Sequence, residues 1–172
     1  MERVGDFEAF FREEYDAVVR SLTLVFGERS TAEDAAQVGF EKALRKWRQV
    51  GDMDRPGTWV YVVALRHARR ALGRGQRSPE PGSRVEVEPE PEVARDTWVR
   101  DAIRALPPRQ RAVIVLRHLV GMSLDEIAEA LRMSTGTVKS TLHAAHSRLR
   151  VELADEDDES DEIEEVPDDA RR

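Results

Sequence analysis

The chain has 172 residues and a formal net charge of -7, with 35% charged and 40% hydrophobic residues. That apolar content supports one domain or two small ones. No apolar run approaches the roughly 18 residues that a membrane-spanning helix needs, and the N-terminus has no stretch typical of a secretory signal. The absence of cysteine excludes disulfides, thiolate zinc sites and a thiol nucleophile. The four histidines form no paired metal spacing, so the sequence predicts no metal site and no membrane contact.

The negative charge is concentrated at one end of the chain. Residues 151–172 hold 12 acidic and 2 basic side chains, a net charge of -10, whereas residues 1–150 sum to +3. Such asymmetry is typical of an interaction tail and not of a fold. The overall charge is therefore no argument against a nucleic-acid partner.

Two segments are predicted to be unfolded. Residues 76–94 are rich in proline and glutamate, which favour an extended spacer. Residues 154–172 form an acidic tail in which like charges repel each other. The rest of the chain is predicted to form two small helical domains, residues 5–75 and 95–153, so we expect an all-α protein. The tail could fold back over the basic domain and compete with DNA, or it could serve solubility alone.

Three helices are predicted in the first domain. Asp6 can cap a helix whose apolar residues recur at intervals of three and four up to Phe26, with Gly27 at its end. Residues 30–33, Ser-Thr-Ala-Glu, have the pattern of a capping box and open a second helix that includes Trp47. Pro56 suits the first turn of a third helix.

Four helices are predicted in the second domain. The first runs from near Asp96 to Leu106, and the second ends at Gly121. A second capping box at residues 123–126 starts a short helix, and the last helix begins at about Thr135 and fades at Leu153.

A short helix, a turn and a second helix with a polar, small-residue face are typical of a helix-turn-helix. In that arrangement the second helix enters the major groove of DNA. Small side chains such as Gly136 allow a close approach, and Lys139 supplies positive charge. An ordinary helical hairpin with a solvated face would give the same spacing.

Several sequence runs then resemble one family. Residues 106–111 (LPPRQR), 123–128 (SLDEIA) and 136–140 (GTVKS) look like the promoter-reading domain of bacterial RNA polymerase sigma factors. Residues 32–40 (AEDAAQVGF), with the later Trp47, resemble the segment by which that family docks on the polymerase. Two matching halves in the right order point to the extracytoplasmic-function type, group IV.

The resemblance implies three sets of contacts. Those to the minus-thirty-five promoter element fall on Thr135, Thr137, Lys139, Ser140, Thr141 and His143. Those to the minus-ten element fall on Gly51, Asp52, Met53, Asp54, Arg55, Arg66, Arg69 and Arg70. Those to core polymerase fall on Asp34, Gln37 and Glu41. Residues 51–55 match the loop that holds a flipped base, although here that loop is acidic. Trp59 and Tyr61 could stack on melted DNA, but Trp59 lies on the apolar stripe and is expected in the core.

The implied function is that of a sigma factor that directs promoter recognition and transcription initiation. We expect no catalytic residue, no enzyme activity and no cofactor. The expected partners are core RNA polymerase and promoter DNA, with an anti-sigma factor as a further one, for a cytoplasmic protein that is monomeric when free. A stand-alone helix-turn-helix regulator is the alternative, but it gives the motifs around Asp34 no role. A sigma mimic that has lost DNA binding also remains open, because the last helix has few arginines.

Overall fold

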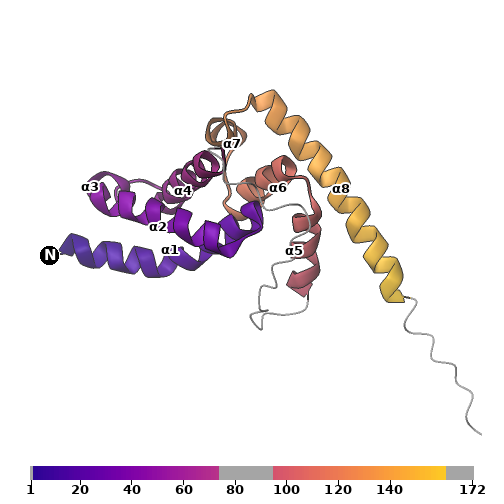
Figure 1. Ribbon diagram of the computed structural model, residues 1–172, viewed down its shortest axis with the longest axis horizontal. Coiled ribbons are helices and arrows are strands. Elements are labelled where there is room, and N and C mark those ends of the chain that lie inside the picture. Colours follow the sequence, from indigo (N-terminus) through magenta and orange to yellow (C-terminus); the bar gives the residue numbers. More distant parts are fainter. Residues whose placement is uncertain (1, 74–94, 162–172) are drawn as a thin grey trace, which may run out of the picture.

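The first helical unit contains four helices. The computed structural model describes residues 2–73 and 95–161, so the predicted linker and the end of the predicted tail lie outside the described residues. The unit consists of α1 (Glu2–Phe26), α2 (Arg29–Arg45), α3 (Trp47–Val50) and α4 (Pro56–Gly73) (Figure 1). Pro56 occupies the start of α4 as the sequence predicts, and Gly27 ends α1 with φ +80°.

The second unit is a helix-turn-helix preceded by two α-helices and a π-helix. It comprises α5 (Arg95–Ala105), α6 (Pro108–Ile114), the π-helix η1 (Val115–Leu119), α7 (Leu124–Leu131) and α8 (Thr135–Asp161). Gly121, with φ +71°, follows η1, and Arg132, with φ 55°, ends α7. The predicted helix borders near residues 96, 106 and 135 are confirmed, and the described residues are helical with no strand. Among them, no helix is apolar and long enough to cross a bilayer.

Aromatic side chains fill one end of the first unit. Phe7 meets Trp47 edge to face with ring centroids 5.2 Å apart, and Phe11 meets Phe40 at 4.9 Å. The helices α2 and α4 pack closely against each other, because the buried face of α2 consists largely of alanines and includes Gly39. A Cβ added at Gly39 would lie 2.9 Å from the carbonyl oxygen of Val60. Only glycine allows the two helices to approach this far.

The two units pack on each other. One cluster of buried apolar side chains includes Leu22 and Leu65 of the first unit and Val113, Leu116 and Ile127 of the second. In this arrangement α1 contacts α5, α6 and η1, and α4 contacts α7. The side of α4 that carries Arg66 and Arg69 therefore faces α7.

Three predicted helix boundaries in the first unit are wrong. Asp6 does not cap α1, because that helix begins at Glu2 and Asp6 lies inside it. The capping box at Ser30 and Glu33 does not form, because α2 starts at Arg29 with Glu28 as its N-cap residue. The hydroxyls of Ser30 and Thr31 donate to the Glu28 carboxylate at 2.6 and 2.9 Å, and Glu33 pairs with Arg29. The helix also breaks at Lys46, so Trp47 belongs to α3.

The last helix differs from the prediction as well. It continues to Asp161 instead of fading at Leu153. At about 1.5 Å per residue, its 27 residues carry the first part of the acidic segment away from the N-terminal end of α8, as the ribbon in Figure 1 shows. This part of the tail therefore does not fold back over the start of α8.

Candidate nucleic-acid interface

The start of α8 is fixed by short polar contacts. The Ser134 hydroxyl accepts a hydrogen bond from the Thr137 backbone N–H at 3.1 Å and lies 2.7 Å from the Thr137 hydroxyl. The Thr135 hydroxyl donates to the Asp125 carboxylate of α7 at 3.0 Å. Ser134 thus caps α8, and the contact with Asp125 joins the two helices of the helix-turn-helix.

The six predicted minus-thirty-five residues lie together on the first half of α8. Thr137, Lys139, Ser140 and His143 are exposed, and Thr135 and Thr141 are half-buried. The opposite face is held in the core by Val138 and Ala145, both fully buried. Because three of the hydroxyls already have partners within the protein, in Asp125, Ser134 and the Thr137 carbonyl, Lys139 and His143 are the groups best placed to reach a ligand.

The capping box predicted at α7 is present. The Glu126 backbone N–H donates to the Ser123 hydroxyl at 3.2 Å, and the Ser123 backbone N–H donates to the Glu126 carboxylate at 2.7 Å. The hydrogen bonds with Ser123 hold the pKa of Glu126 below its usual value, and the bond from the Ser123 backbone N–H has the larger effect. The first helix of the helix-turn-helix is therefore anchored by a charged cap.

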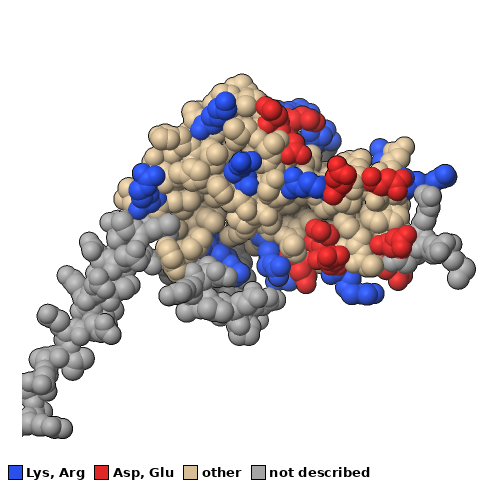
Figure 2. All heavy atoms as spheres, turned by 180° about the vertical axis from the view of Figure 1, so that it is seen from behind, with Lys and Arg blue, Asp and Glu red and all other residues tan. Residues whose placement is uncertain are grey.

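Lys and Arg side chains dominate the surface around α8. In the view of Figure 2, basic side chains are spread over the face along α8, whereas acidic groups lie over the first unit and over α7, whose Asp125, Glu126 and Glu129 are exposed. In the sequence, residues 96–150 hold 9 basic and 5 acidic side chains, a net charge of +4, whereas residues 1–75 sum to +1. A positive surface beside an exposed polar helix face suits a phosphate backbone.

The predicted flipped-base loop connects α3 to α4. Gly51, Asp52, Met53, Asp54 and Arg55 are all exposed. Asp54 and Arg55 border a cavity of about 300 Å³ that is also lined by residues of α1 and by Leu119 and Val120 of the second unit. The loop therefore opens onto the boundary between the two units.

Tyr61 also lines this cavity, but it is buried. Its exposed fraction is 1%, and its hydroxyl has no hydrogen-bond partner among the described residues. Burial raises the pKa of this hydroxyl far above its usual range. The suggestion that Tyr61 stacks on melted DNA is therefore wrong for this arrangement, whereas Trp59 packs against the core as expected.

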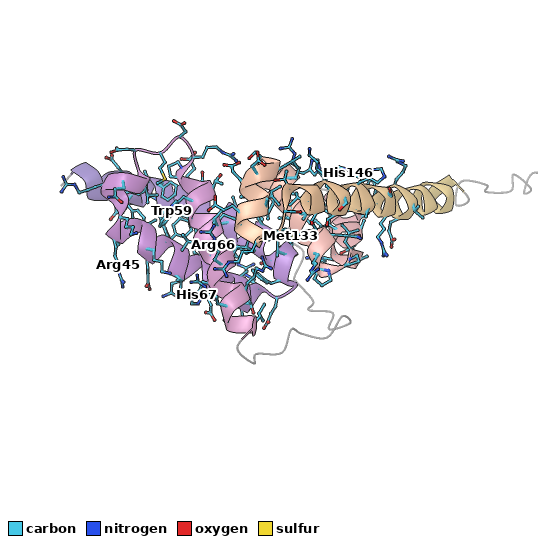
Figure 3. All side chains as sticks on the ribbon, turned by 90° about the horizontal axis from the view of Figure 1, so that it is seen from above. Arg45, Trp59, Arg66, His67, Met133 and His146 are labelled. Carbon is cyan, nitrogen blue, oxygen red and sulfur yellow. The ribbon has the colours of Figure 1, made fainter. Side chains whose placement is uncertain are left out.

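Three of the predicted minus-ten arginines bind the second unit. Arg55 donates to the carbonyls of Gly121 at 3.0 Å and Val120 at 2.5 Å. Arg66 pairs with Glu129 of α7 at 2.9 Å, and Figure 3 shows Arg66 near the turn that carries Met133. We call these contacts, with that of Arg69 described next, the arginine latch.

Arg69 completes the latch at the end of α7. It donates to the Leu131 carbonyl at 3.0 Å. Desolvation, followed by the nearby charges of Arg109 and Arg132, lowers the pKa of Arg69. Arg69 and the neighbouring Arg70 are both exposed.

The three predicted polymerase contacts share one face of α2. Asp34, Gln37 and Glu41 are all exposed, at spacings of three and four residues. Gln37 donates to Glu41 at 3.5 Å. Leu44 extends the same stripe with half of its surface exposed. The predicted contacts do not include Leu44, although its position one turn beyond Glu41 on α2 could have indicated it.

Sequence reasoning also missed the partners of the latch. Glu129 and the carbonyls of Val120, Gly121 and Leu131 lie 62 to 66 residues from the arginines that they bind. Every residue carries a backbone carbonyl, so the sequence does not indicate which carbonyl accepts a hydrogen bond from an arginine. A lone glutamate on a helix face likewise does not reveal a partner in another domain.

Comparisons with known proteins match both halves of the chain. Residues 10–78 match the family described as Sigma-70 region 2, and residues 96–149 match Sigma-70, region 4. The chain is 35% identical over 160 residues to the RNA polymerase sigma-E factor of Streptomyces antibioticus, which covers 90% of this chain and 88% of that relative. It is 32% identical to the ECF RNA polymerase sigma factor SigL of Mycobacterium tuberculosis, over 82% of this chain and 85% of the relative.

The fold is similar to a solved sigma factor. The match is to RpoE in complex with the anti-sigma factor NepR from Bartonella quintana, with a TM-score of 0.69 and 21% identity. It covers 87% of this chain and 97% of the other. Both halves of the chain thus have counterparts in sigma factors. A stand-alone DNA-binding regulator would account for the second half only.

Proposed function

The chain belongs to the extracytoplasmic-function family of RNA polymerase sigma factors, which act in promoter recognition, and from this premise we propose how its surfaces divide that task. The observation that carries the proposal is a contrast within the molecule. The N-terminal half of α8 is exposed, whereas Arg55, Arg66 and Arg69 are bound to the second unit.

The first half of α8 reads the minus-thirty-five element. Lys139 and His143 reach the DNA directly, and Ser140 and Thr141 contact phosphates or base edges. Ser134 and Thr137 hold the helix N-terminus, which favours a phosphate. The absence of arginine from this face predicts that Lys139 carries most of the charge-dependent affinity.

The minus-ten contacts require the two units to separate. Arg55, Arg66 and Arg69 exchange carbonyl and carboxylate partners for DNA phosphates, and residues 51–55 hold the flipped base. Hydrogen bonds from charged donors contribute about 1.5–3 kcal/mol when shielded, and exposed ion pairs about 0–1 kcal/mol. Because the latch is largely exposed, its polar contacts contribute only a few kcal/mol to the closed state, and a partner that opens the chain must also offset the buried apolar contacts between the units.

Core RNA polymerase is that partner. The stripe of Asp34, Gln37, Glu41 and Leu44 binds it through charge and one apolar contact, and docking favours the open arrangement. The stripe lies on the exposed face of α2, away from the packed α2–α4 contact, so it is available in the closed state. This predicts an order in which polymerase binds first and the minus-ten arginines act second.

An anti-sigma factor is the second partner that we propose. The support is the solved relative, which was captured with one. We further propose that the protein acts in the cytoplasm, has no enzyme activity of its own and works as a dissociable subunit. The closed arrangement is one that such a partner could stabilise by binding both units at once.

The test is transcription with core polymerase on a selected promoter pool. The intact chain is expected to give abortive transcripts from a defined promoter, and Asp34→Arg to abolish them while leaving binding of a minus-thirty-five duplex unchanged. A chain that binds core polymerase but never initiates would contradict the proposal and favour a sigma mimic. If Asp34→Arg initiates transcription as well as the parent chain does, the α2 stripe does not bind core polymerase.

A further inference from the structure

Two histidines far apart in the sequence meet on the surface of the second unit. His118 lies in η1 and His146 lies in α8, where Figure 3 labels it. Their Nε2 atoms are 2.9 Å apart, whereas the ring centroids are 5.1 Å apart. One Nε2–H therefore donates to the other Nε2, and both side chains are exposed. The DNA and polymerase contacts proposed above use neither histidine.

His146 belongs to a line of basic side chains along α8. Successive residues of an α-helix are about 100° apart around its axis, so spacings of four, three and four residues place four side chains within a sector of about 60°. All four are exposed, and we call them the α8 stripe: Lys139, His143, His146 and Arg150. His118 joins this stripe from η1 through its hydrogen bond to His146.

The α8 stripe is longer than the groove that its first part is proposed to enter. At about 1.5 Å per residue, Lys139 and Arg150 are about 16 Å apart along the axis, whereas the major groove of B-DNA is about 12 Å wide. A helix that enters the groove by its N-terminal end therefore brings later residues of the same face to the phosphates at the groove edge. His146 and Arg150 occupy that later part, and His118 lies beside them.

The histidine pair can gain a positive charge without losing its hydrogen bond. In the neutral pair, the ring that donates its Nε2–H has a free lone pair at Nδ1, whereas the accepting ring carries its proton at Nδ1. A solvent proton that binds to the free Nδ1 converts the donating ring to an imidazolium. The Nε2–H···Nε2 bond then becomes charge-assisted and therefore stronger.

The surroundings of the free pair oppose this proton. Desolvation, then the charges of His146 and Arg117, lower the pKa of His118. On α8 the stripe adds His143 and Arg150, about one turn to either side of His146. η1 also packs against α1, α6 and α7, but no group on the described parts of these helices is among the causes of the shift. An opposite charge within about 4–6 Å, such as a DNA phosphate, would favour the imidazolium.

Building on the proposed reading of the minus-thirty-five element, we propose that the DNA surface of the second unit extends along α8 to His146 and Arg150 and across to His118 of η1. The histidine pair takes up one proton when it meets a phosphate. Affinity for the duplex therefore rises as pH falls, and it levels off once the free chain is protonated as well. A rise of one pKa unit in the complex corresponds to about tenfold in affinity.

The first experiment measures binding of a minus-thirty-five duplex to the full chain between pH 8 and pH 5.5 at constant salt. His143 lies on the stripe and titrates too, so every variant carries His143→Gln. In that background we expect affinity to rise about three- to tenfold as pH falls. Adding both His118→Gln and His146→Gln should abolish the rise, whereas adding His67→Gln on α4 should leave it unchanged. No rise in the background, or a rise that survives the loss of both histidines, overturns the proposal.

A second experiment compares two arginines of the same helix. Arg150 lies on the α8 stripe, whereas Arg148 is also exposed but lies about 160° away around the axis, where it borders a cavity that residues of α5 line as well. Arg150→Gln is expected to weaken duplex binding about threefold and to lower the salt slope by about one, whereas Arg148→Gln changes neither. Equal effects of the two variants would show that net charge determines binding, and would contradict the extended surface.

A third readout uses the unmodified chain and does not depend on how variants fold. Adding the duplex should raise the pKa of His118, followed through its imidazole resonances, and leave the titration of His67 unchanged. An unchanged His118 in the bound chain contradicts the proton uptake, although promoter reading by α8 would stand. If the unmodified chain binds no duplex at any pH, the proposed function itself is wrong.

Discussion

The two proposed DNA-reading surfaces of this protein are presented differently. The first half of α8 is exposed and is held by contacts within its own unit, through Ser134 and the Thr135–Asp125 bond. The arginines of α4 and of the preceding loop are instead bound by the opposite unit. This difference indicates that the α8 surface can bind DNA in the free chain. The arginines must first release their contacts with the second unit.

This contrast suggests a division of control. Exposed Lys139 can attract a duplex at any time, with the salt dependence that phosphate contacts impose. Arg55 and Arg66 become available only when the units separate. Because any ligand that binds the open state preferentially shifts this equilibrium, polymerase docking can control promoter melting without contacting the arginines.

The largest effect is expected from a variant that weakens DNA binding by the first half of α8. Lys139→Glu reverses the one described positive charge among the six predicted minus-thirty-five residues, and we expect binding of a minus-thirty-five duplex to fall roughly 30-fold with a smaller salt slope. Fluorescence anisotropy at several salt concentrations measures both. Lys42→Glu, an exposed reversal on α2, is the matched control. Equal losses in the two variants would mean that net charge and not the α8 face determines binding.

A charge swap tests the arginine latch. Glu129→Arg turns the attraction for Arg66 into repulsion, and we expect the open population of the free chain to rise about five- to tenfold, from roughly 1 kcal/mol of lost and reversed pairing. The double variant Arg66→Glu with Glu129→Arg restores an ion pair and should close the chain again. Single-molecule energy transfer measures the open fraction. Glu152→Arg, exposed on α8, is the control, and an absence of rescue would remove Arg66–Glu129 from the latch.

The capping box sets the stability of the α7 end of the latch. Ser123→Ala removes the hydroxyl that accepts the Glu126 N–H, and we expect about 1 kcal/mol less stability of the helix-turn-helix unit at neutral pH. Hydrogen exchange of the α7 amides reports this locally. Ser147→Ala, which removes an exposed hydroxyl that bonds within α8, serves as the control. An unchanged exchange rate in Ser123→Ala would show that the cap contributes nothing.

The same cap predicts the smallest effect, a dependence on pH. The pKa of Glu126 is lowered in the folded chain from its usual 4.5, so its stabilising contribution is present above pH 4.5 and is lost as pH falls through the folded-state pKa. Glu126→Gln should flatten this part of the stability curve measured by chemical denaturation. If the variant and the parent lose stability equally between pH 5 and 3, another carboxylate accounts for the loss.

The sequence predicted best those features that depend on neighbouring residues. Pro56 at the start of α4, Gly27 at the end of α1 and the Ser123–Glu126 box all follow from local chemistry. The failed box at Ser30 shows the limit of this reasoning, because Glu28 supplied a nearer acceptor for the same hydroxyls. Local patterns identify groups that can cap a helix, but they do not rank competing acceptors.

Contacts between distant residues were beyond such patterns. The α8 residues could be predicted because they share one helix face. The latch could not, since Arg55 binds carbonyls 65 and 66 residues away. The hydrogen bond between His118 of η1 and His146 of α8 likewise joins residues that are 28 positions apart, and no spacing in the sequence indicates it.

The central claim is that the free chain is closed and that core polymerase opens it. The chain contains no cysteine, so Arg45→Cys on α2 and Arg148→Cys on α8 provide two unique labelling sites, both exposed. Pulsed electron spin resonance should give one narrow distance distribution for the free protein and a longer distance after core polymerase is added. A free protein that already shows the distribution of the polymerase complex would contradict the account.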